Sequence, residues 1–576
     1  MTQEKTSTGY PSIDKPWLKY YSEEAVKRQM EPNTIYGHLY ENNKENLEDI
    51  ALIYFERKVT YRALFDKIEQ CKRGLMALGV KKGDIVTIQT LAIPQTVVLF
   101  YALSRIGAIA NLVYVSNDED EVKEILKKTK SCAYFVIDSI YAKFHDVLSG
   151  TSVKNVILLS IATEMDKVTK IVYRISRKKG KIKYSSNVCS WNAFIGQQND
   201  RVMADEKDDN LPVAMVYTGG TTGKSKAVVL TNRSINELVF QYEKADMGLV
   251  RQHVFMNSLP PFIAFGLSFS LHLPLCMGIK TVLIPDPLPQ NQGKVFFKYK
   301  PNYYVAGPVQ IEAILNYPKI NKKDLSFVEI LATGGDALPA SAEKRINDFL
   351  KQHNSDIRVF QGYGMSELAA TVCTGSPSAL RFGTVGIPLP NTNVKIINTD
   401  TGEELAYEQQ GEVCVCAPSV MKEYFKDADE TRKIMKMHED GKLWIHTGDI
   451  GTIDKDGFLT IVGRIKRMIL VKEDTKETAV YQKIFPQILE QRIESLEGVN
   501  AAVIVSNGGT ADEQRLIAFI VPVTENRNLE NEIRQYVKGN FKGYEQPVEY
   551  RFVSELPRTK IGKVDYRKLE CMARKE

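Results

Sequence analysis

The segment Tyr217-Thr218-Gly219-Gly220-Thr221-Thr222-Gly223-Lys224-Ser225-Lys226 decides how this chain folds around its chemistry. Its glycines let the backbone curl, so that several N–H groups can point at one anion. Its threonine hydroxyls add hydrogen-bond donors, and its two lysines neutralise negative charge. An ordinary glycine-rich turn would need neither. We therefore expect this loop to hold the phosphates of a nucleotide.

The residues that follow the loop distinguish two kinds of phosphate-binding loop. A Walker loop, G-x-x-x-x-G-K-[ST], runs directly into a helix whose N-terminus holds the phosphate. Here Thr218 occupies the place of the first glycine, and Ala227–Leu230 is a short apolar run typical of a strand. Helical spacing begins only after Thr231 and Asn232, both good N-cap residues. The loop is therefore expected to join two strands of a hairpin, Ala214–Tyr217 and Ala227–Leu230.

Length and composition indicate a multidomain globular enzyme. The chain has 576 residues, more than the ~250–300 at which a single core stops growing. A hydrophobic content of 43% with 25% charged residues is typical of a soluble enzyme, and a net charge of +6 does not call for nucleic acid. The eight cysteines lack zinc-type spacing, and the N-terminus lacks the apolar core of a signal peptide. We expect reduced thiols and a cytoplasmic location.

The order of sequence patterns predicts the architecture. Residues 45–230 and 254–361 alternate helical patterns with short apolar strands, which favours α/β layers with largely parallel sheets. Hairpins dominate from about residue 385, and a small α+β pattern follows Arg467. The predicted fold class is α/β: a large N-terminal domain of layered α/β subdomains plus a small β-barrel-like part, then a small mobile C-terminal α+β domain. The boundaries predicted are 1–464 for the N-terminal domain, 465–467 for a hinge and 468–576 for the C-terminal domain. Expected strands include Tyr303–Ala306, Ile330–Thr333, Val394–Ile397 and Gly411–Cys416.

A basic run at 167–183 mixes lysines and arginines with apolar residues. We expect a solvated helix in a loop insertion. The alternative is a peripheral contact with anionic lipid headgroups.

Two further motifs lie where α/β proteins bind ligands. Gly334-Gly335-Asp336 and Gln361-Gly362-Tyr363-Gly364-Met365-Ser366-Glu367 each follow an expected strand, the second ending near Phe360. The carboxyl ends of such strands form the usual ligand edge of the sheet. Tyr363 could stack on adenine, and Glu367 could hold Mg²⁺ beside the phosphates.

Two later motifs add charged groups. Thr447-Gly448-Asp449 places a carboxylate next to an expected tight turn, which suits the two hydroxyls of a ribose. Pro557-Arg558-Thr559-Lys560-Ile561-Gly562-Lys563 places a lysine on a glycine-bearing loop of the small domain. Each motif alone has an ordinary structural explanation, such as a turn residue or a surface charge.

In this order and spacing, the motifs resemble those of the adenylate-forming superfamily, which comprises acyl-CoA synthetases, carrier-loading adenylation domains and firefly-type luciferases. The resemblance covers about residues 45 to 570. The Thr-Gly-Gly-Thr-Thr-Gly form of the loop is most similar to medium- and long-chain fatty acyl-CoA synthetases.

The resemblance implies a two-step reaction. A carboxylate attacks the α-phosphate of ATP·Mg²⁺ to give an acyl-adenylate and pyrophosphate, and a thiol such as that of CoA then releases AMP. Lys563 would bridge the carboxylate and the α-phosphate, Glu367 would hold the metal, and Lys466 would be the hinge residue. Lys224 or Lys226 would hold the departing phosphates, and Asp449 with Arg464 would fix the ribose. The implied nucleotide site comprises Thr218, Gly219, Gly220, Thr221, Thr222, Gly223, Lys224, Lys226, Gly334, Gly335, Asp336, Gly362, Tyr363, Gly364, Met365, Ser366, Asp449 and Arg464.

The sequence departs from the family pattern in two places. After Lys472, where relatives have a glycine that meets the thiol substrate, a polar insertion follows at 473–482. Ile263 stands where many relatives have histidine, which suggests an apolar wall near the acyl group. The main expectation is an acyl-CoA synthetase for an aliphatic acid. The alternatives are a ligase that loads an acyl-carrier protein, a luciferase-like oxygenase and an inactive nucleotide-binding relative.

Overall fold

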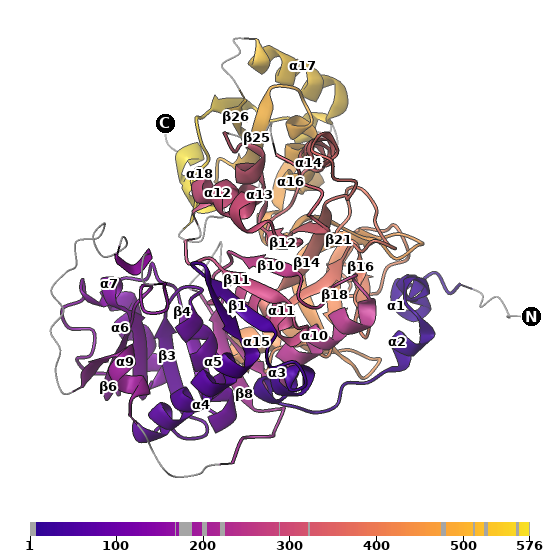
Figure 1. Cartoon of the computed structure of the whole chain (residues 1–576). Coiled ribbons are helices and arrows are strands. Elements are labelled where there is room, and N and C mark those ends of the chain that lie inside the picture. Colours follow the sequence, from indigo (N-terminus) through magenta and orange to yellow (C-terminus); the bar gives the residue numbers. More distant parts are fainter. Residues whose placement is uncertain are drawn as a thin grey trace, which may run out of the picture.

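The computed structural model describes residues 7–166, 169–171, 187–197, 204–218, 225–286, 288–318, 320, 323–473, 480–510, 513–523, 528–559 and 564–574. Two sheet-bearing halves lie side by side, and the C-terminal residues form a separate lobe above their junction (Figure 1). Most of the basic run at 167–183 lies outside the described residues. Among the helices described, none is both long and apolar enough to cross a bilayer.

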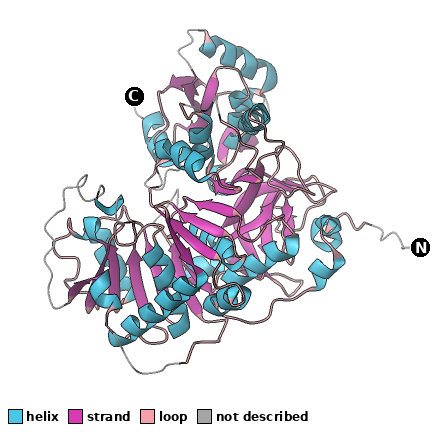
Figure 2. Ribbon diagram, in the orientation of Figure 1, coloured by secondary structure: helices cyan, strands magenta, loops and turns pink. Residues whose placement is uncertain are grey.

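An eight-stranded sheet carries the phosphate loop. Its order is β19-β9-β8-β4-β3-β5-β6-β7, and the pairs among β3 to β6 are parallel. Helices cover both faces, as Figure 2 shows, because the buried strands are apolar on both sides. The strands are β3 (Ile85–Gln89), β4 (Ile109–Val113), β5 (Ala133–Ile137), β6 (Asn155–Leu159), β7 (Val188–Ser190), β8 (Pro212–Tyr217), β9 (Ala227–Thr231) and β19 (Glu423–Tyr424). The main helices beside them are α4 (Tyr61–Ala77), α5 (Pro94–Ile106), α6 (Glu119–Thr129) and α9 (Trp191–Ile195).

A nine-stranded sheet supplies the opposite wall of the site. Its order is β16-β15-β14-β13-β12-β10-β11-β1-β2, parallel from β14 to β1 and antiparallel at both edges. The strands are β1 (Ile50–Tyr54), β2 (Arg57–Thr60), β10 (Val254–Asn257), β11 (Lys280–Leu283), β12 (Tyr303–Ala306), β13 (Ile330–Thr333), β14 (Phe360–Met365), β15 (Ala370–Thr374) and β16 (Ile387–Pro388). Its outer face is covered by α12 (Pro289–Tyr299), α13 (Pro308–Leu315) and α14 (Ala340–Gln352).

One hydrophobic core joins these two large sheets. It contains side chains from both sheets and from the helices between them. Those helices are α3 (Ile35–Asn43), α10 (Asn232–Ala245), a π-helix (Phe265–His272) and α11 (Leu273–Cys276). Helix α10 begins where the sequence predicts, because the Thr231 hydroxyl accepts a hydrogen bond from the N–H of Ser234. The two sheets therefore pack against each other through one continuous core.

A third, antiparallel sheet of five strands forms the barrel-like part. Its order is β17-β18-β21-β20, with β22 paired to β21. The strands are β17 (Asn393–Ile397), β18 (Gly411–Cys416), β20 (Met435–Met437), β21 (Leu443–Ile453) and β22 (Leu459–Arg464), and α15 (Ala428–Ile434) lies beside them. Val413 and Val415 face one core while Cys414 and Cys416 share the opposite face, as the alternation predicts.

The C-terminal residues form their own small cores. A 3₁₀ turn, Ile465–Arg467, follows β22. The two hydrophobic clusters beyond it draw only on residues 469–573 among those described. Their elements are β23 (Ile469–Glu473), β24 (Val480–Ile484), α16 (Pro486–Glu494), β25 (Val499–Ser506), β26 (Leu516–Pro522), α17 (Leu529–Asn540), β27 (Glu549–Phe552) and α18 (Tyr566–Arg574).

The predicted fold class is confirmed, and two local predictions are wrong. The Gly362–Met365 segment does not follow a strand: it continues β14 and pairs with β15. The Thr447–Asp449 segment is not a tight turn. It lies inside β21, where Gly448 has a positive φ of 70° and the register against β18 shifts. In both places a glycine lets a strand continue through a distortion that local patterns assign to a loop.

Candidate active site

A cavity of about 1660 Å³ opens where the three sheets meet the C-terminal lobe. The predicted residues that line it are Thr218, Lys226, Gly334, Gly335, Asp336, Gly362, Tyr363, Gly364, Met365, Ser366, Glu367, Arg464 and Lys466. Gly219–Lys224 and Lys563 lie outside the described residues. One cavity thus brings together motifs that are separated in sequence by up to about half of the chain's length.

The phosphate loop leaves a hairpin, as the sequence predicts. β8 and β9 pair antiparallel, with Tyr217 opposite Ala227. The Thr218 N–H donates to the Lys226 carbonyl (3.0 Å), and the Lys226 N–H donates to the Thr218 hydroxyl (3.2 Å). The Ser225 hydroxyl donates to the Thr218 carbonyl (2.6 Å). These bonds close the base of the loop, so both loop ends are fixed at the cavity wall.

Glu367 is held in a buried polar position at the end of β14. Its carboxylate accepts a hydrogen bond from the Tyr424 hydroxyl (2.5 Å), and its carbonyl accepts one from the Met421 N–H (2.7 Å). Burial raises the pKa of Glu367, although Tyr424, Arg464 and Lys226 each act to lower it. A bound cation would favour the ionised carboxylate.

The backbone around Glu367 is under steric constraint. Ala369 and Ala370 have positive φ values of 55° and 135°, which cost free energy in residues with a Cβ. A Cβ on Gly364 would lie 1.7 Å from the carbonyl oxygen of Ala370, so only glycine fits there. The chain therefore folds sharply back after Glu367, and β15 pairs with β14 directly behind the carboxylate.

Lys226 has a partner on α15. Its ammonium group forms an ion pair with Glu430 of α15 and lies 4.7 Å from the ring centre of Tyr424. The contacts of Lys226 and Lys433 lower the pKa of Glu430 to about 2. A triphosphate that used Lys226 would have to compete with this carboxylate.

Asp449 is buried next to residues of the cavity wall, and its predicted contact with a ribose stays a prediction. Its carboxylate accepts hydrogen bonds from the Tyr363 hydroxyl (2.7 Å) and pairs with the Arg464 guanidinium (2.9 Å). Only 4% of Asp449 is exposed, whereas the Arg464 side chain is 52% exposed. Protein groups therefore engage both carboxylate oxygens of Asp449.

The bulge in β21 fixes where Asp449 points. The Gly448 N–H donates to the Glu412 carboxylate (3.0 Å). The Thr447 hydroxyl donates to the Val413 carbonyl (2.8 Å) and accepts from the Asp449 N–H (3.0 Å). Glu412 and Val413 both belong to β18. Two hydrogen bonds therefore connect the bulge to this neighbouring strand.

The C-terminal lobe meets the cavity through basic residues. Arg558 lines the cavity beside Arg467 and Lys466 of the 3₁₀ turn. Arg467 pairs with Glu490 of α16 (2.5 Å) and lies 3.8 Å from the ring centre of Tyr566. The turn is thus attached firmly to the C-terminal lobe.

Comparison with known proteins agrees with this arrangement. The family model of AMP-binding enzymes matches residues 39–425, and the model of the AMP-binding enzyme C-terminal domain matches residues 489–563. This chain belongs to the AMP-binding enzymes. It is thus a member of the adenylate-forming superfamily, as its motifs predict.

The relatives of this AMP-binding enzyme differ in substrate. A long-chain-fatty-acid–CoA ligase of Bacillus subtilis is 25% identical over 564 residues, 96% of this chain and 97% of that protein. A probable 4-coumarate–CoA ligase of Dictyostelium discoideum is 29% identical over 518 residues, 87% of each. The solved structure of an anthranilate CoA ligase in complex with anthranoyl-AMP superposes with a TM-score of 0.79 at 20% identity and covers 95% of this chain and 98% of that chain. Such a structural likeness shows the fold.

Sequence patterns missed several residues of this AMP-binding enzyme's site. Tyr424 contacts Glu367, which is 57 residues away in sequence, and Glu430 contacts Lys226, which is 204 residues away. Neither stands in a glycine-rich motif. The nearest signal is the pair of acidic residues Asp429 and Glu430, which also suits the first turn of α15.

Proposed function

We propose that this AMP-binding enzyme activates an apolar carboxylic acid, in the main case a fatty acid, to an acyl-adenylate and transfers the acyl group to CoA. The observation that carries the proposal is one large cavity, which is lined both by the predicted nucleotide-site residues and by apolar side chains. The relatives named as CoA ligases for fatty and aromatic acids support the same reaction class.

The nucleotide half of the cavity suits ATP. The loop that starts at Thr218 would hold the β- and γ-phosphates with backbone and hydroxyl donors. Tyr363 and the Gly334–Asp336 turn line the region in which adenine would lie. Asp449, once released by Arg464, would accept the ribose hydroxyls. The nucleotide would then present its α-phosphate to the centre of the cavity.

The donor set near the phosphates fits a magnesium ion. Glu367 offers a carboxylate oxygen, the ligand type that Mg²⁺ prefers, at the cavity wall. Mg²⁺ would spread the negative charge that develops on the α-phosphate. Tyr424 holds one carboxylate oxygen, so the orientation of Glu367 is set before the ion arrives.

The acyl half of the cavity is apolar. Phe262, Ile263, Phe265 and Phe269 line it along the segment that leads into the π-helix. Ile263 is half-buried: it packs against the main core and also lines this wall, which supports the sequence-based suggestion of an apolar wall. Burial of each CH₂ of a substrate here would contribute about 0.8 kcal/mol.

A second cavity of only about 40 Å³ lies behind the first. It is lined almost entirely by apolar side chains, Met247, Leu249 and Phe255 among them. The two cavities share a partition, and its residues are Tyr242, Phe269, Val305, Ala332 and Thr374. A long acyl tail would extend toward this space, and the partition would limit the length that is accepted.

The two-step chemistry would assign two roles to the C-terminal lobe. Lys563 would contact both the carboxylate and the α-phosphate, which lowers the repulsion between two anions as they approach. Lys466 lies in the turn that connects the lobe, where a change of a few backbone dihedrals would carry Lys563 away before the thiol attacks.

Loading of an acyl-carrier protein is the second candidate, and the polar insertion favours it. β23 and β24 pair as an antiparallel hairpin, with Glu473 opposite Val480 at its end. The middle of the insertion, 474–479, lies outside the described residues. Its polar sequence stands where the family resemblance implies contact with the thiol substrate, and a protein acceptor would use it as an additional contact.

The decisive experiment measures pyrophosphate and AMP release with a panel of fatty, aryl and amino acids, with and without CoA. Formation of AMP and acyl-CoA with apolar acids is expected. An adenylate that accumulates until a carrier protein is added would favour the second candidate. The proposal fails if the purified protein consumes no ATP with any acid.

A further inference from the structure

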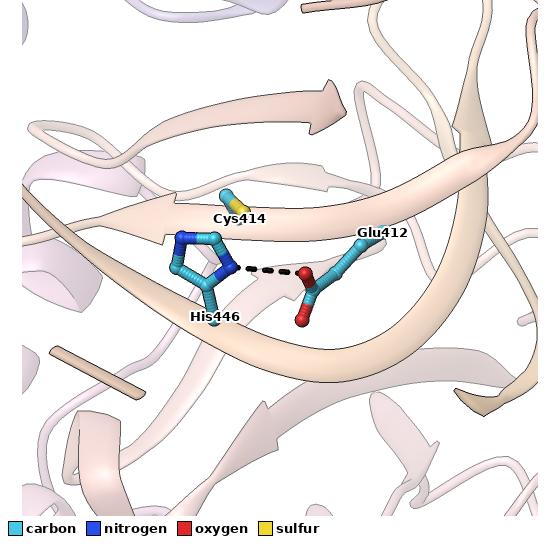
Figure 3. Close-up of side chains that lie close together, drawn as sticks. All are labelled: Glu412, Cys414 and His446. Carbon is cyan, nitrogen blue, oxygen red and sulfur yellow. Dashed lines mark hydrogen bonds and ion pairs between the residues drawn. The ribbon is translucent and has the colours of Figure 1, made fainter. Parts of the chain in front are cut away.

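A cluster of metal-binding side chains lies on the five-stranded sheet, next to the proposed nucleotide site. Glu412 and Cys414 are two positions apart on β18, so they point to the same face. Cys414 is the register partner of His446 on β21. Figure 3 shows the three side chains converging on one region above the strands. Cross-strand pairing therefore brings together a carboxylate, a thiol and an imidazole.

The distances in this cluster are close to those of a metal site. One ligand atom from each of the three residues can be chosen so that all lie within 4.8 Å of one another. Ligands of a tetrahedral zinc ion lie roughly 3.3–3.8 Å apart, because each bond is about 2.0–2.3 Å long. A contraction of about 1 Å would suffice, and rotation of side chains can supply it.

A second histidine holds the imidazole from the other side. His446 Nδ1 lies 2.9 Å from the Glu412 carboxylate, and its Nε2 lies 3.0 Å from Nε2 of His438. When Nδ1 binds a metal, the proton moves to Nε2 and can be donated to His438. Such a partner on the second nitrogen is typical of metal-binding histidines.

We propose that Glu412, Cys414 and His446 bind a zinc-class divalent ion, with His438 as the hydrogen-bond partner that orients His446. The combination of one thiolate, one imidazole and one carboxylate suits Zn²⁺ rather than the Mg²⁺ of the nucleotide site. Coordination releases the thiol proton to solvent. A water molecule would complete four ligands.

The ion could reach the cluster from the large cavity, and its binding would stabilise the nearby bulge in β21. Glu412 and His446 both line the large cavity, whereas Cys414 is fully buried behind them. The second oxygen of Glu412 accepts the Gly448 N–H, directly before Asp449. A bound ion would therefore fix the bulge that positions Asp449, and the folded state would gain stability by mass action.

Two lysines lie on strands that neighbour the cluster. Lys395 of β17 is the register partner of Cys414, and its ammonium group lies 4.1 Å from the ring centre of Trp444. Lys436 of β20 is the register partner of Trp444 of β21. The negative charges of the Glu412 carboxylate and of a coordinated thiolate would offset their repulsion of the ion.

The test is a titration of the full-length, chelator-treated protein with Co²⁺ in the absence of nucleotide. Cobalt bound by a thiolate gives a sulfur-to-metal charge-transfer band that water and carboxylate ligands do not give. We expect one equivalent to saturate the band and Zn²⁺ to displace it. Zn²⁺ should also raise the thermal unfolding midpoint by roughly a few degrees at high excess over Kd.

Variants locate the site. Cys414→Ser should abolish the band, and Glu412→Gln and His438→Gln should each weaken Zn²⁺ affinity at least tenfold. The matched control is Cys416→Ser, because Cys416 lies two positions further along the same face of β18. This control should keep the band and the affinity.

The inference is overturned if the native protein shows no saturable band, or if Cys414→Ser keeps it. Circular dichroism without metal checks that each variant folds. If Cys414→Ser does not fold, unchanged Zn²⁺ affinity in both Glu412→Gln and His438→Gln overturns the site. None of these measurements depends on the proposed acid–CoA ligase activity.

Discussion

The cavity wall of the N-terminal domain and the C-terminal lobe present charged groups in different ways. On the wall, Glu367 and Asp449 are held by side chains from other strands, each backed by a large core. In the lobe, Arg467 makes its strong contacts with Glu490 and with Tyr566 of the lobe itself. The charged groups of the wall are thus held by contacts between distant segments, whereas the contacts of Arg467 stay within the lobe.

The largest expected effect tests the C-terminal lobe. Lys563→Ala should lower adenylation by about 10³-fold, because the variant loses the charge that we propose to contact the reacting anions. Thiolysis of added acyl-adenylate should stay near the native rate. Pyrophosphate release and thioester formation are measured separately.

The control for this variant is Lys568→Ala, which removes an exposed lysine on α18 of the same lobe. It should leave both half-reactions unchanged. Equal loss of both half-reactions in Lys563→Ala would contradict a role confined to the first step.

The next effect tests the fixed wall. Glu367→Gln should lower kcat by about 10²-fold, since the amide holds Mg²⁺ poorly but keeps an acceptor for Tyr424. Because burial raises the pKa of Glu367, native adenylation should decline as the pH falls through that raised value, and the variant should lack this decline. Rates from pH 5 to 9 provide the test.

The thermal unfolding midpoint of Glu367→Gln provides a second test of the role of Glu367. Its raised pKa means that the ionised carboxylate disfavours the folded state at neutral pH. Glu367→Gln should therefore unfold at the same or a slightly higher temperature than the native protein. A lower midpoint would show that the activity loss reflects damage to the fold. Glu423→Gln, an exposed acid beside Tyr424, is the matched control.

A third prediction concerns the attachment of the lobe. Arg467→Met should destabilise the lobe by about 2 kcal/mol, because it leaves the mostly buried Glu490 carboxylate without its partner. The unfolding of the lobe should then separate from that of the N-terminal domain in calorimetry. Arg492→Met, at an exposed position of α16, should not change the transition. A single unshifted transition in Arg467→Met would show that the pair contributes little.

The smallest effect lies within the lobe. Burial raises the pKa of Glu494 to about 8, so the folded state keeps a proton that the unfolded state loses near pH 4.5. Stability should thus fall as the pH rises from about 4.5 to 8, and the loss is complete above that range. Glu494→Gln can still accept the Ala502 hydrogen bond and should stabilise the lobe by on the order of 1 kcal/mol at pH 9.

Denaturant titrations at pH 5 and pH 9 measure this difference. Glu497→Gln, an exposed neighbour, serves as the control. A gain for Glu494→Gln that is equal at both pH values would contradict the ionisation argument.

Local sequence patterns predicted most of the framework. The strands at Tyr303–Ala306, Ile330–Thr333 and Gly411–Cys416 occur with the predicted bounds, because each is a short apolar run between clear turn or helix signals. Thr231 caps α10 as its side-chain chemistry indicates. The domain boundary at 465–467 stays a prediction, with the separate lobe cores in its favour.

The patterns failed where distant segments decide the structure. The bulge at Gly448 depends on Glu412 and Val413 of another strand, and no feature of the Thr-Gly-Asp motif reports that contact. The ion pair between Lys226 and Glu430 follows from β19 pairing with β9 next to α15. Motifs indicate candidate ligand-binding residues, whereas tertiary packing determines the side chains that hold these residues in place.

The attachment of Arg467 has a consequence for recombination between relatives. Arg467 contacts Glu490 and the ring of Tyr566, which both belong to the lobe. A transplanted lobe that starts at Ile465 would therefore contain Arg467 together with both of its partners. A graft that starts after Arg467 would need an acid and an aromatic ring where Glu490 and Tyr566 stand. The best crossover point in this chain is therefore the end of β22.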